Sequence, residues 1–170
     1  MARYLVVANQ TLGGGALSAT IKFRFMEGAV IHVVVPATRR THLGVTSTEV
    51  AANAEAQHRL SRELQRCEKD GIHATGEVGA SDPMQAIKSA LREHHYTGLI
   101  ISTLPASISQ WLHLDLPHRA MREFQLPVEW VETRHDDETP SEVHLAVPAS
   151  AFKAMHGPRF PARDLPPLAE

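Results

Sequence analysis

The sequence contains a single cysteine, Cys67, and shows no large excess of charge of either sign. One cysteine excludes an internal disulfide framework. The formal net charge is -2 and the pI is about 6.6, and no run of lysines or basic arm is present. These values indicate no basic surface that would bind the phosphates of a nucleic acid, so we expect no nucleic-acid partner.

Long hydrophobic runs are also missing. The apolar runs, of which Val30–Pro36 is typical, fall far short of the roughly 20 residues that a membrane helix needs. The segment 1–10 enters an expected strand directly and lacks the apolar core and cleavage site of a signal peptide. We therefore expect no membrane insertion and a cytoplasmic location.

The chain has 11 histidines, but they are spread without the spacing of metal ligands: HExxH is absent and Cys67 has no cysteine neighbour. We expect no metal site. His32 stands in an apolar run and predicts a hydrogen-bonded core histidine. Cys67 falls on the apolar face of an expected helix and predicts an inert small hydrophobe. His94 and His95 end a helix, where cations suit the helix dipole.

Five short apolar segments alternate with helical stretches, and 43% hydrophobic residues suit one globular domain with some extra chain. The order predicts an open, doubly wound, five-stranded and mostly parallel α/β sheet with helices on both faces. The segment 72–78 alternates small apolar and polar residues, which favours an edge strand. The five expected strands are 4–9, 30–36, 72–78, 99–103 and 126–132.

Two helix starts carry clear signals. Thr46 and Glu49 match a capping box, and Asp82 followed by Pro83 is typical of an N-cap and first helical position. The helix after the first box is expected to bury one apolar face, made of Val50, Ala54, Leu60, Leu64 and Cys67.

The composition changes after Glu132. We expect an α/β domain over 1–132, followed over 133–170 by an acidic linker and a proline-rich tail that is extended or disordered. The segment 143–147, with the sequence VHLAV, is a candidate sixth short strand.

The motifs GASDPMQAI after the third strand and GLIIST in the fourth resemble the universal stress protein (UspA-like) family. The segments YLVVANQTLGGG, VVVPAT and STLPASISQWLHLDLPHR are similar to an actinobacterial branch, whose domains are found alone or attached to amino-acid permeases. The resemblance implies a Rossmann-like fold of the adenine nucleotide alpha-hydrolase-like type with strand order 3-2-1-4-5. It also implies a homodimer and a possible association with a transporter.

ATP-binding members of that family carry G-x2-G-x9-G-[ST] after the fourth strand. The same spacing falls here on Ser102, Pro105, Asp115 and Leu116, so every phosphate-cradling residue is changed. Pro105 has no N–H to donate. Asp115 is expected to cap the last helix and to place a negative charge where a triphosphate would lie. Because Asn9 or Gln10 also replaces the family's aspartate, we expect no tight ATP binding of the usual type and no cofactor, with ATP or AMP disfavoured.

A crevice for a small anionic ligand is expected at the switch point between strands one and four. The glycine run could form an anion nest, although a flexible turn is the favoured interpretation. Trp111 is expected to pack rather than to stack on a ligand, and Arg119 and Arg122 could form a solvated face. The candidate crevice residues are Asn9, Gln10, Thr11, Gly13, Gly14, Gly15, Val35, Ser102, Thr103, Ser107, Ser109, His113 and Arg119.

Three functions remain open at this stage. A non-catalytic regulatory or small-ligand-binding domain is favoured; an adenine-nucleotide-binding stress sensor and a nucleotide hydrolase or transferase are the alternatives. Against an enzyme, no serine has an evident base and orienting partner, and a capping role explains Asp115, which lies near His118, better than a catalytic one. The dimer is expected through the fifth strand, where Val128 and Trp130 alternate with Glu129 and leave an edge for a partner strand.

Overall fold

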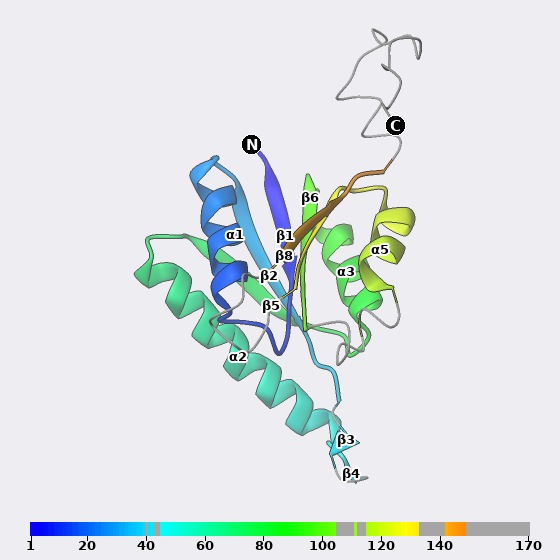
Figure 1. Ribbon diagram of the computed structural model, residues 1–170. Coiled ribbons are helices and arrows are strands. Elements are labelled where there is room, and N and C mark those ends of the chain that lie inside the picture. Colours follow the sequence, from blue (N-terminus) through cyan, green and yellow to red (C-terminus); the bar gives the residue numbers. More distant parts are fainter. Residues whose placement is uncertain (40, 43–44, 105–110, 112–114, 133–141, 149–170) are drawn as a thin grey trace, which may run out of the picture.

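The strands of the computed structural model form one mixed sheet and one small hairpin (Figure 1). The structure describes residues 1–39, 41–42, 45–104, 111, 115–132 and 142–148. The strands of the main sheet are β1 (Arg3–Val7), β2 (Val30–Pro36), β5 (Ala74–Gly79), β6 (Gly98–Thr103), β7 (Val128–Glu132) and β8 (Glu142–Ala146).

The strand order is β5-β2-β1-β6-β7-β8. The first five strands in this order are parallel to one another, and β8 pairs with β7 in the antiparallel sense. The predicted order 3-2-1-4-5 is therefore confirmed, with β5 at one edge as expected. The sheet has six strands rather than five, because the candidate strand in the segment after the linker does form.

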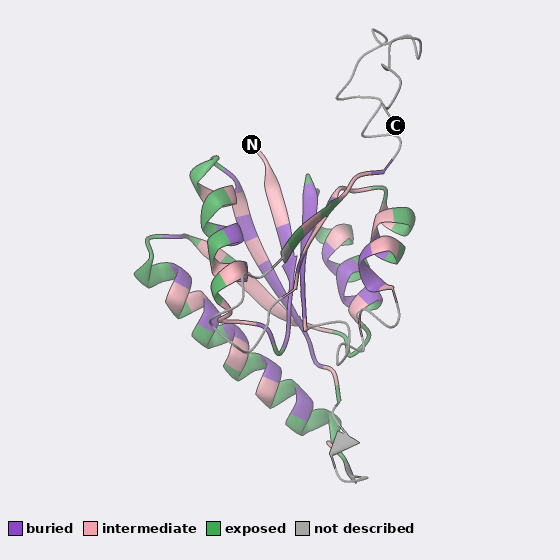
Figure 2. Cartoon of the chain, viewed as in Figure 1, coloured by how far each residue is buried: buried purple, intermediate pink, exposed green. Residues whose placement is uncertain are grey.

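Within the described residues, the helices that cover the sheet are α1 (Gly15–Met26), α2 (Glu49–Lys69), α3 (Pro83–Glu93) and α5 (Leu116–Phe124). Alternate side chains of β1 enter two separate cores. Figure 2 shows that buried residues are concentrated along the central strands of the sheet. Val6 packs with α1 and α2, whereas Leu5 and Val7 pack with α3 and α5. Helices thus cover both faces, which explains why the central strands are continuous apolar runs.

The start and the buried face of α2 differ from the prediction. Thr48, not Thr46, is the N-cap, and its side chain accepts the backbone N–H of Ala51 at 3.2 Å. Thr46 belongs to the short hairpin of β3 (Thr41–His42) and β4 (Val45–Thr46). The buried face uses smaller residues than expected, while Val50 is 80% exposed. Its members are Ala52, Ala56, Leu60, Glu63 and Cys67.

The predicted start of α3 is confirmed. Asp82 is the N-cap, its carboxylate accepts the backbone N–H of Met84 at 3.1 Å, and Pro83 is the first helical residue. His94 occupies the C-cap, as expected from its position. The start of this helix is determined by residues that are adjacent in the sequence, which is why it could be predicted.

Candidate functional site

The carboxyl ends of β1 and β6 lie next to each other in the sheet. Val7 pairs with Ile101, and the hydroxyl of Thr11 donates to the backbone carbonyl of Ser102 at 3.2 Å. Thr11, Ser102 and Thr103 are all buried. The structure therefore brings together the two strand ends that were expected to form the crevice.

Asn9 ties the end of β1 to two other segments. Its amide nitrogen donates to the carbonyl of Pro36, at the end of β2, over 2.7 Å. Its amide oxygen accepts a hydrogen bond from Arg59 of α2. Asn9 is 8% exposed, whereas its neighbour Gln10 is exposed. The nitrogen and the oxygen of the Asn9 amide therefore both form hydrogen bonds that link the end of β1 to β2 and to α2.

The glycine run forms a turn that α2 holds in place. Gly13 has a φ of 88°, Gly14 is the N-cap of α1 and donates its N–H to the carbonyl of Thr11 at 3.1 Å, and Gly15 begins the helix. The carbonyl of Gly13 accepts a hydrogen bond from Arg66 of α2. The backbone angle at Gly13 favours glycine, whereas the Arg66 guanidinium, 2.7 Å from an added Cβ, is the end of a flexible side chain that could move aside.

The hydroxyl oxygen of Thr103 is buried without a hydrogen-bond partner in the described part of the chain. Thr103 is the last residue of β6 and is 2% exposed. A buried hydroxyl without a partner costs free energy, so its presence at a strand end of this type marks a position where a ligand atom could supply the bond.

Asp115 stands at the N-cap of α5, but it does not cap the helix. Its backbone is left-handed, with φ 52° and ψ 39°, and its side chain accepts no backbone N–H of the helix. Its carboxylate instead lies 2.6 Å from Nδ1 of His118 and 3.5 Å from the guanidinium of Arg122. The predicted cap is therefore wrong, because the left-handed backbone turns the side chain toward His118.

The remaining residues predicted to line the crevice differ in their burial and position. Val35 is fully buried in the core beneath α1 and α2, and Arg119 is exposed on α5. Ser107, Ser109 and His113 lie outside the described residues, as does Pro105 of the altered glycine motif.

Two further residues of this region belong to the core on the α3 and α5 side of the sheet. Trp111 packs against that core, which confirms the packing interpretation. Leu116, the last position of the altered glycine motif, is also a core residue, at 2% exposure.

The edge expected to carry the dimer contact is covered by the chain itself. β8 pairs along β7, with Val128 opposite Ala146 and Trp130 opposite His144. Val128 is fully buried, and the Trp130 ring stacks on His144 with centroids 4.7 Å apart. The prediction of a free edge at the fifth strand is therefore wrong: the outer strand on this side is β8.

Three residues of α2 that border the glycine turn were not predicted from the sequence: Arg59, Glu63 and Arg66. Glu63 is 2% exposed, and burial raises the pKa of its carboxyl, an effect that Arg66 opposes. The spacing 59, 63, 66 marks one side of a helix, but only the fold shows that this side meets a loop some fifty residues away.

Other titratable groups behave as the sequence suggests. Burial raises the pKa of the Cys67 thiol to about 11, so the thiol stays protonated and inert at neutral pH. Burial lowers the pKa of His32, whose Nδ1 lies 2.8 Å from the Thr75 hydroxyl. His32 is thus hydrogen-bonded as expected, but it is partly buried rather than a core residue.

The described residues contain no group of three or more histidine, cysteine, aspartate or glutamate side chains placed to hold a metal ion. Among the same residues, none of the helices has the length and apolar character needed to cross a membrane.

The strand order and the helices on both faces define an α/β protein with the fold of the universal stress proteins. A universal stress family protein from Burkholderia pseudomallei superimposes with a TM-score of 0.56 at 16% identity, covering 78% of this chain and 96% of that one. A universal stress family protein from Arabidopsis thaliana, with AMP bound, gives a TM-score of 0.53 at 13% identity, covering 82% and 96%.

The same fold is found in an enzyme. A deacetylase of the teicoplanin biosynthesis pathway gives a TM-score of 0.51 at 13% identity and covers 78% of this chain and 67% of the deacetylase. In sequence, the chain matches no family model and no curated protein. At these identities the likeness establishes the fold.

Proposed function

We propose that the chain is a non-catalytic, universal-stress-protein-like regulatory domain that binds a small ligand at the ends of β1 and β6. The observation that carries the proposal is the buried hydroxyl of Thr103, which has no partner among the described residues and lies in the strand next to the Asn9–Thr11 turn. In open α/β sheets this edge is where ligands bind.

The proposed ligand is not ATP held in the manner of the glycine-loop members. Asn9 is engaged by Pro36 and Arg59, so it replaces the family's aspartate with a structural link. Asp115 brings a carboxylate to the start of α5, where a triphosphate would need bare N–H groups. Leu116, which stands at the motif's last position, is a core residue rather than a hydroxyl donor.

A non-catalytic role is supported by the environment of the nucleophile and base candidates. Cys67 is buried with a pKa of about 11, which leaves almost no thiolate at neutral pH. His118 is paired with Asp115 and lies edge-on to Trp130 at 5.1 Å between ring centroids. Within the described residues, no hydroxyl or thiol completes a nucleophile–base–carboxylate arrangement around His118.

An adenine-nucleotide sensor is the second candidate, favoured by the AMP bound to the Arabidopsis protein of the same fold. A hydrolase is the less favoured alternative, supported only by the deacetylase among the similar structures. Both alternatives use the same strand ends, so the identity of what binds there separates them from the proposal.

The test is native mass spectrometry of the purified protein, followed by calorimetric titration with MgATP and AMP. We expect no retained nucleotide and no response to either nucleotide at about millimolar concentration. Retained nucleotide or micromolar ATP binding would contradict the proposal, and retained AMP would support the sensor. Turnover of a phosphoester would identify an enzyme.

The variant Thr103→Val locates any ligand that a thermal-shift screen of small metabolites identifies. The exchange of an unpaired buried hydroxyl for a methyl group leaves the fold at least as stable. A ligand of the crevice should therefore stabilise the wild type and lose most of that effect in T103V. Thr20→Val, which alters a buried threonine of α1, is the matched control.

A further inference from the structure

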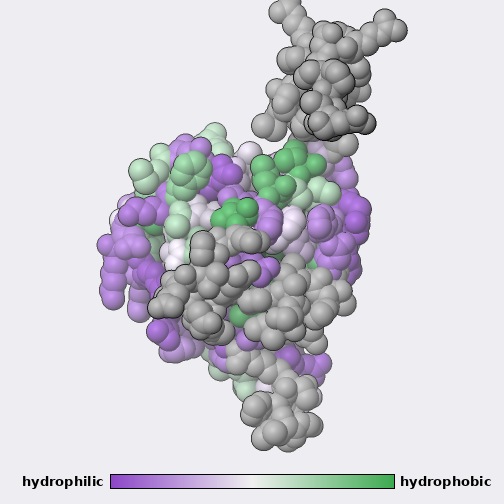
Figure 3. All heavy atoms as spheres, in the orientation of Figure 1, coloured by the Kyte–Doolittle hydropathy of each residue, from purple (hydrophilic) through white to green (hydrophobic). Residues whose placement is uncertain are grey.

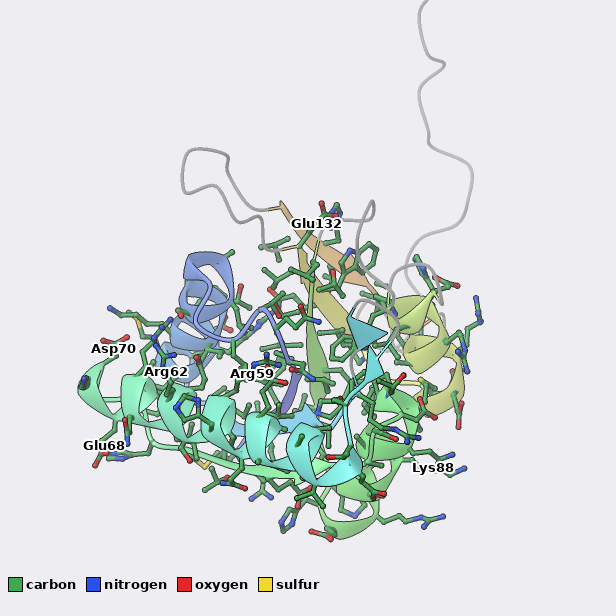
Figure 4. All side chains as sticks on the ribbon, turned by 90° about the horizontal axis from the view of Figure 1, so that it is seen from below. Arg59, Arg62, Glu68, Asp70, Lys88 and Glu132 are labelled. Carbon is green, nitrogen blue, oxygen red and sulfur yellow. The ribbon has the colours of Figure 1, made fainter. Side chains whose placement is uncertain are left out.

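A cleft of about 330 Å³ lies between the glycine turn and the outer side of α2. Leu12 and Gly13 form one wall, and the other wall comes from the second half of the helix. In Figure 4 Arg59 and Arg62 extend from α2 toward the turn, whereas Glu68 points away on the opposite side of the helix. The cleft therefore faces one side of α2 only, and we call it the α2 cleft.

Four cations line the α2 cleft: Arg59, Arg62, Arg66 and Lys69. Their spacing of three or four residues places them along one stripe of the helix. Two of them are already used, because Arg66 binds the Gly13 carbonyl and Arg59 binds Asn9 and Glu55. Within the described chain, Arg62 and Lys69 form no ion pair.

Glu63 is the second, independent feature of the α2 cleft. Its carboxyl is 2% exposed, lines the cleft and leaves Oε1 without a hydrogen-bond partner among the described residues. A buried carboxyl oxygen that accepts no hydrogen bond is unfavourable, so a donor that reaches it would stabilise the site. Nη1 of the neighbouring Arg66 guanidinium is bound to Gly13 and to Ser18, and no described residue donates to Oε1, so a molecule in the cleft can supply the donor.

We propose that the α2 cleft binds a small molecule that carries one oxyanion group, phosphate or carboxylate, and at least one hydroxyl group. Arg62 and Lys69 hold the oxyanion, and Oε1 of Glu63 accepts a hydrogen bond from the hydroxyl. This site goes beyond the crevice at the strand ends and shares only the glycine turn with it.

Size and charge limit the ligand. A volume of about 330 Å³ is at the low end of small-molecule pockets, which suits a sugar phosphate or a hydroxy acid better than a nucleoside triphosphate. The Glu63 carboxyl in the wall, together with Asp70 at the end of α2, also opposes a ligand of high negative charge. The site thus fits one oxyanion in a hydroxylated molecule.

The test is isothermal titration calorimetry at low ionic strength with four probes: inorganic phosphate, glucose 6-phosphate, gluconate and glucose. We expect glucose 6-phosphate or gluconate to bind at least about tenfold more tightly than inorganic phosphate, because only they also supply the hydroxyl. Their ratio distinguishes a phosphate from a carboxylate site. Glucose alone is expected not to bind. Failure of both hydroxylated oxyanions to bind at about 10 mM would overturn the proposal.

Two sets of variants assign any binding to the α2 cleft. Arg62→Gln with Lys69→Gln should weaken the tighter probe at least about tenfold. Lys88→Gln with Arg92→Gln removes the same charge from exposed positions of α3 and should leave affinity within about twofold. Equal losses in the two double variants would show a general charge effect and overturn the proposal.

Glu63→Leu tests the hydroxyl contact. It should reduce the advantage of the hydroxylated probe over inorganic phosphate while phosphate itself binds at least as well. An unchanged ratio in folded E63L would overturn the assigned role of Glu63. Thr103→Val, which alters the crevice, is expected to leave all four titrations unchanged, so failure at one site is distinguishable from failure at the other.

Discussion

Asn9 shows how one side chain can connect three elements at a candidate site. It follows β1, its amide nitrogen binds the carbonyl that ends β2, and its amide oxygen receives Arg59 from α2. Because an amide both donates and accepts, no carboxylate can make the same pair of bonds. Asparagine at this position therefore favours a closed structural link between β1, β2 and α2.

Asn9→Asp should destabilise the protein by about 1–3 kcal/mol, as measured by urea unfolding. The new carboxylate oxygen would face the Pro36 carbonyl at the distance of the present 2.7 Å hydrogen bond, with no proton between them. The attraction of the carboxylate for Arg59 offsets part of this loss. Gln10→Asp adds the same charge to an exposed neighbour and should change stability by less than about 0.5 kcal/mol. Equal stability of N9D and Q10D would contradict a structural role for the Asn9 amide.

Asp115 illustrates why single-residue chemistry was harder to predict than the sheet. An aspartate directly before Leu116-Pro117 is typical of an N-cap residue, and the helix does begin there. Whether the carboxylate turns to the helix amides or to His118 depends on the backbone, which is left-handed at this residue. Aspartate tolerates that conformation better than most residues, so the local sequence permits both outcomes.

At the scale of elements, α2 can pack closely on the sheet because the residues at the contact have small side chains or none. Gly76 of β5 lies under α2, where an added Cβ would be 2.6 Å from the Leu60 methyl group and 2.6 Å from the Val33 carbonyl oxygen. The helix can rest on the edge strand because this residue and the buried alanines of α2 are small. Because alanine contributes little to a pattern of large apolar residues, the buried face of α2 was predicted incorrectly, and Val50 was placed on it.

Gly76→Ala should cost about 1–3 kcal/mol in urea unfolding, because the methyl group has to displace both a core side chain and a backbone carbonyl. Gly15→Ala is the comparison: nothing lies within 4 Å of the added Cβ, and the residue is helical. G15A is expected to be neutral or stabilising by up to about 1 kcal/mol. A G76A protein as stable as the wild type would mean that α2 does not rest against β5 in this way.

The sequence predicted those elements whose cause is local. The mostly parallel sheet followed from the alternation of apolar segments, and the start of α3 followed from Asp82 and Pro83. The strand order came only from the family resemblance. The link between Gly13 and Arg66 was not predictable in this way, because the two residues are 53 positions apart and the bond exists only after α2 has packed. The α2 cleft and its buried Glu63 were missed for the same reason.

At the scale of the whole molecule, we expect a second copy to meet the protein at β8. It covers the edge of β7 and ends the sheet, and Val143 and Leu145 are 50% and 63% exposed on it. Figure 3 shows strongly hydrophobic residues gathered over this strand. The other edge strand, β5, carries no exposed large hydrophobic residue among those described. An outer strand with alternating apolar side chains is a template for symmetric pairing, so the expected homodimer shifts from β7 to β8.

Val143→Lys with Leu145→Lys should therefore convert a dimer to a monomer, with the dimer dissociation constant raised at least about tenfold in sedimentation velocity. Lysines on an edge strand oppose pairing with a like strand, through charge and through loss of apolar contact, while the β7–β8 hydrogen bonds within one chain remain. Val50→Lys alters a valine that is 80% exposed on α2 and should leave the dimer intact. A wild type that stays monomeric at about 100 μM would contradict the dimer itself. A dimer that survives both lysines would instead move the interface away from β8, because two buried positive charges in each copy could not be tolerated there.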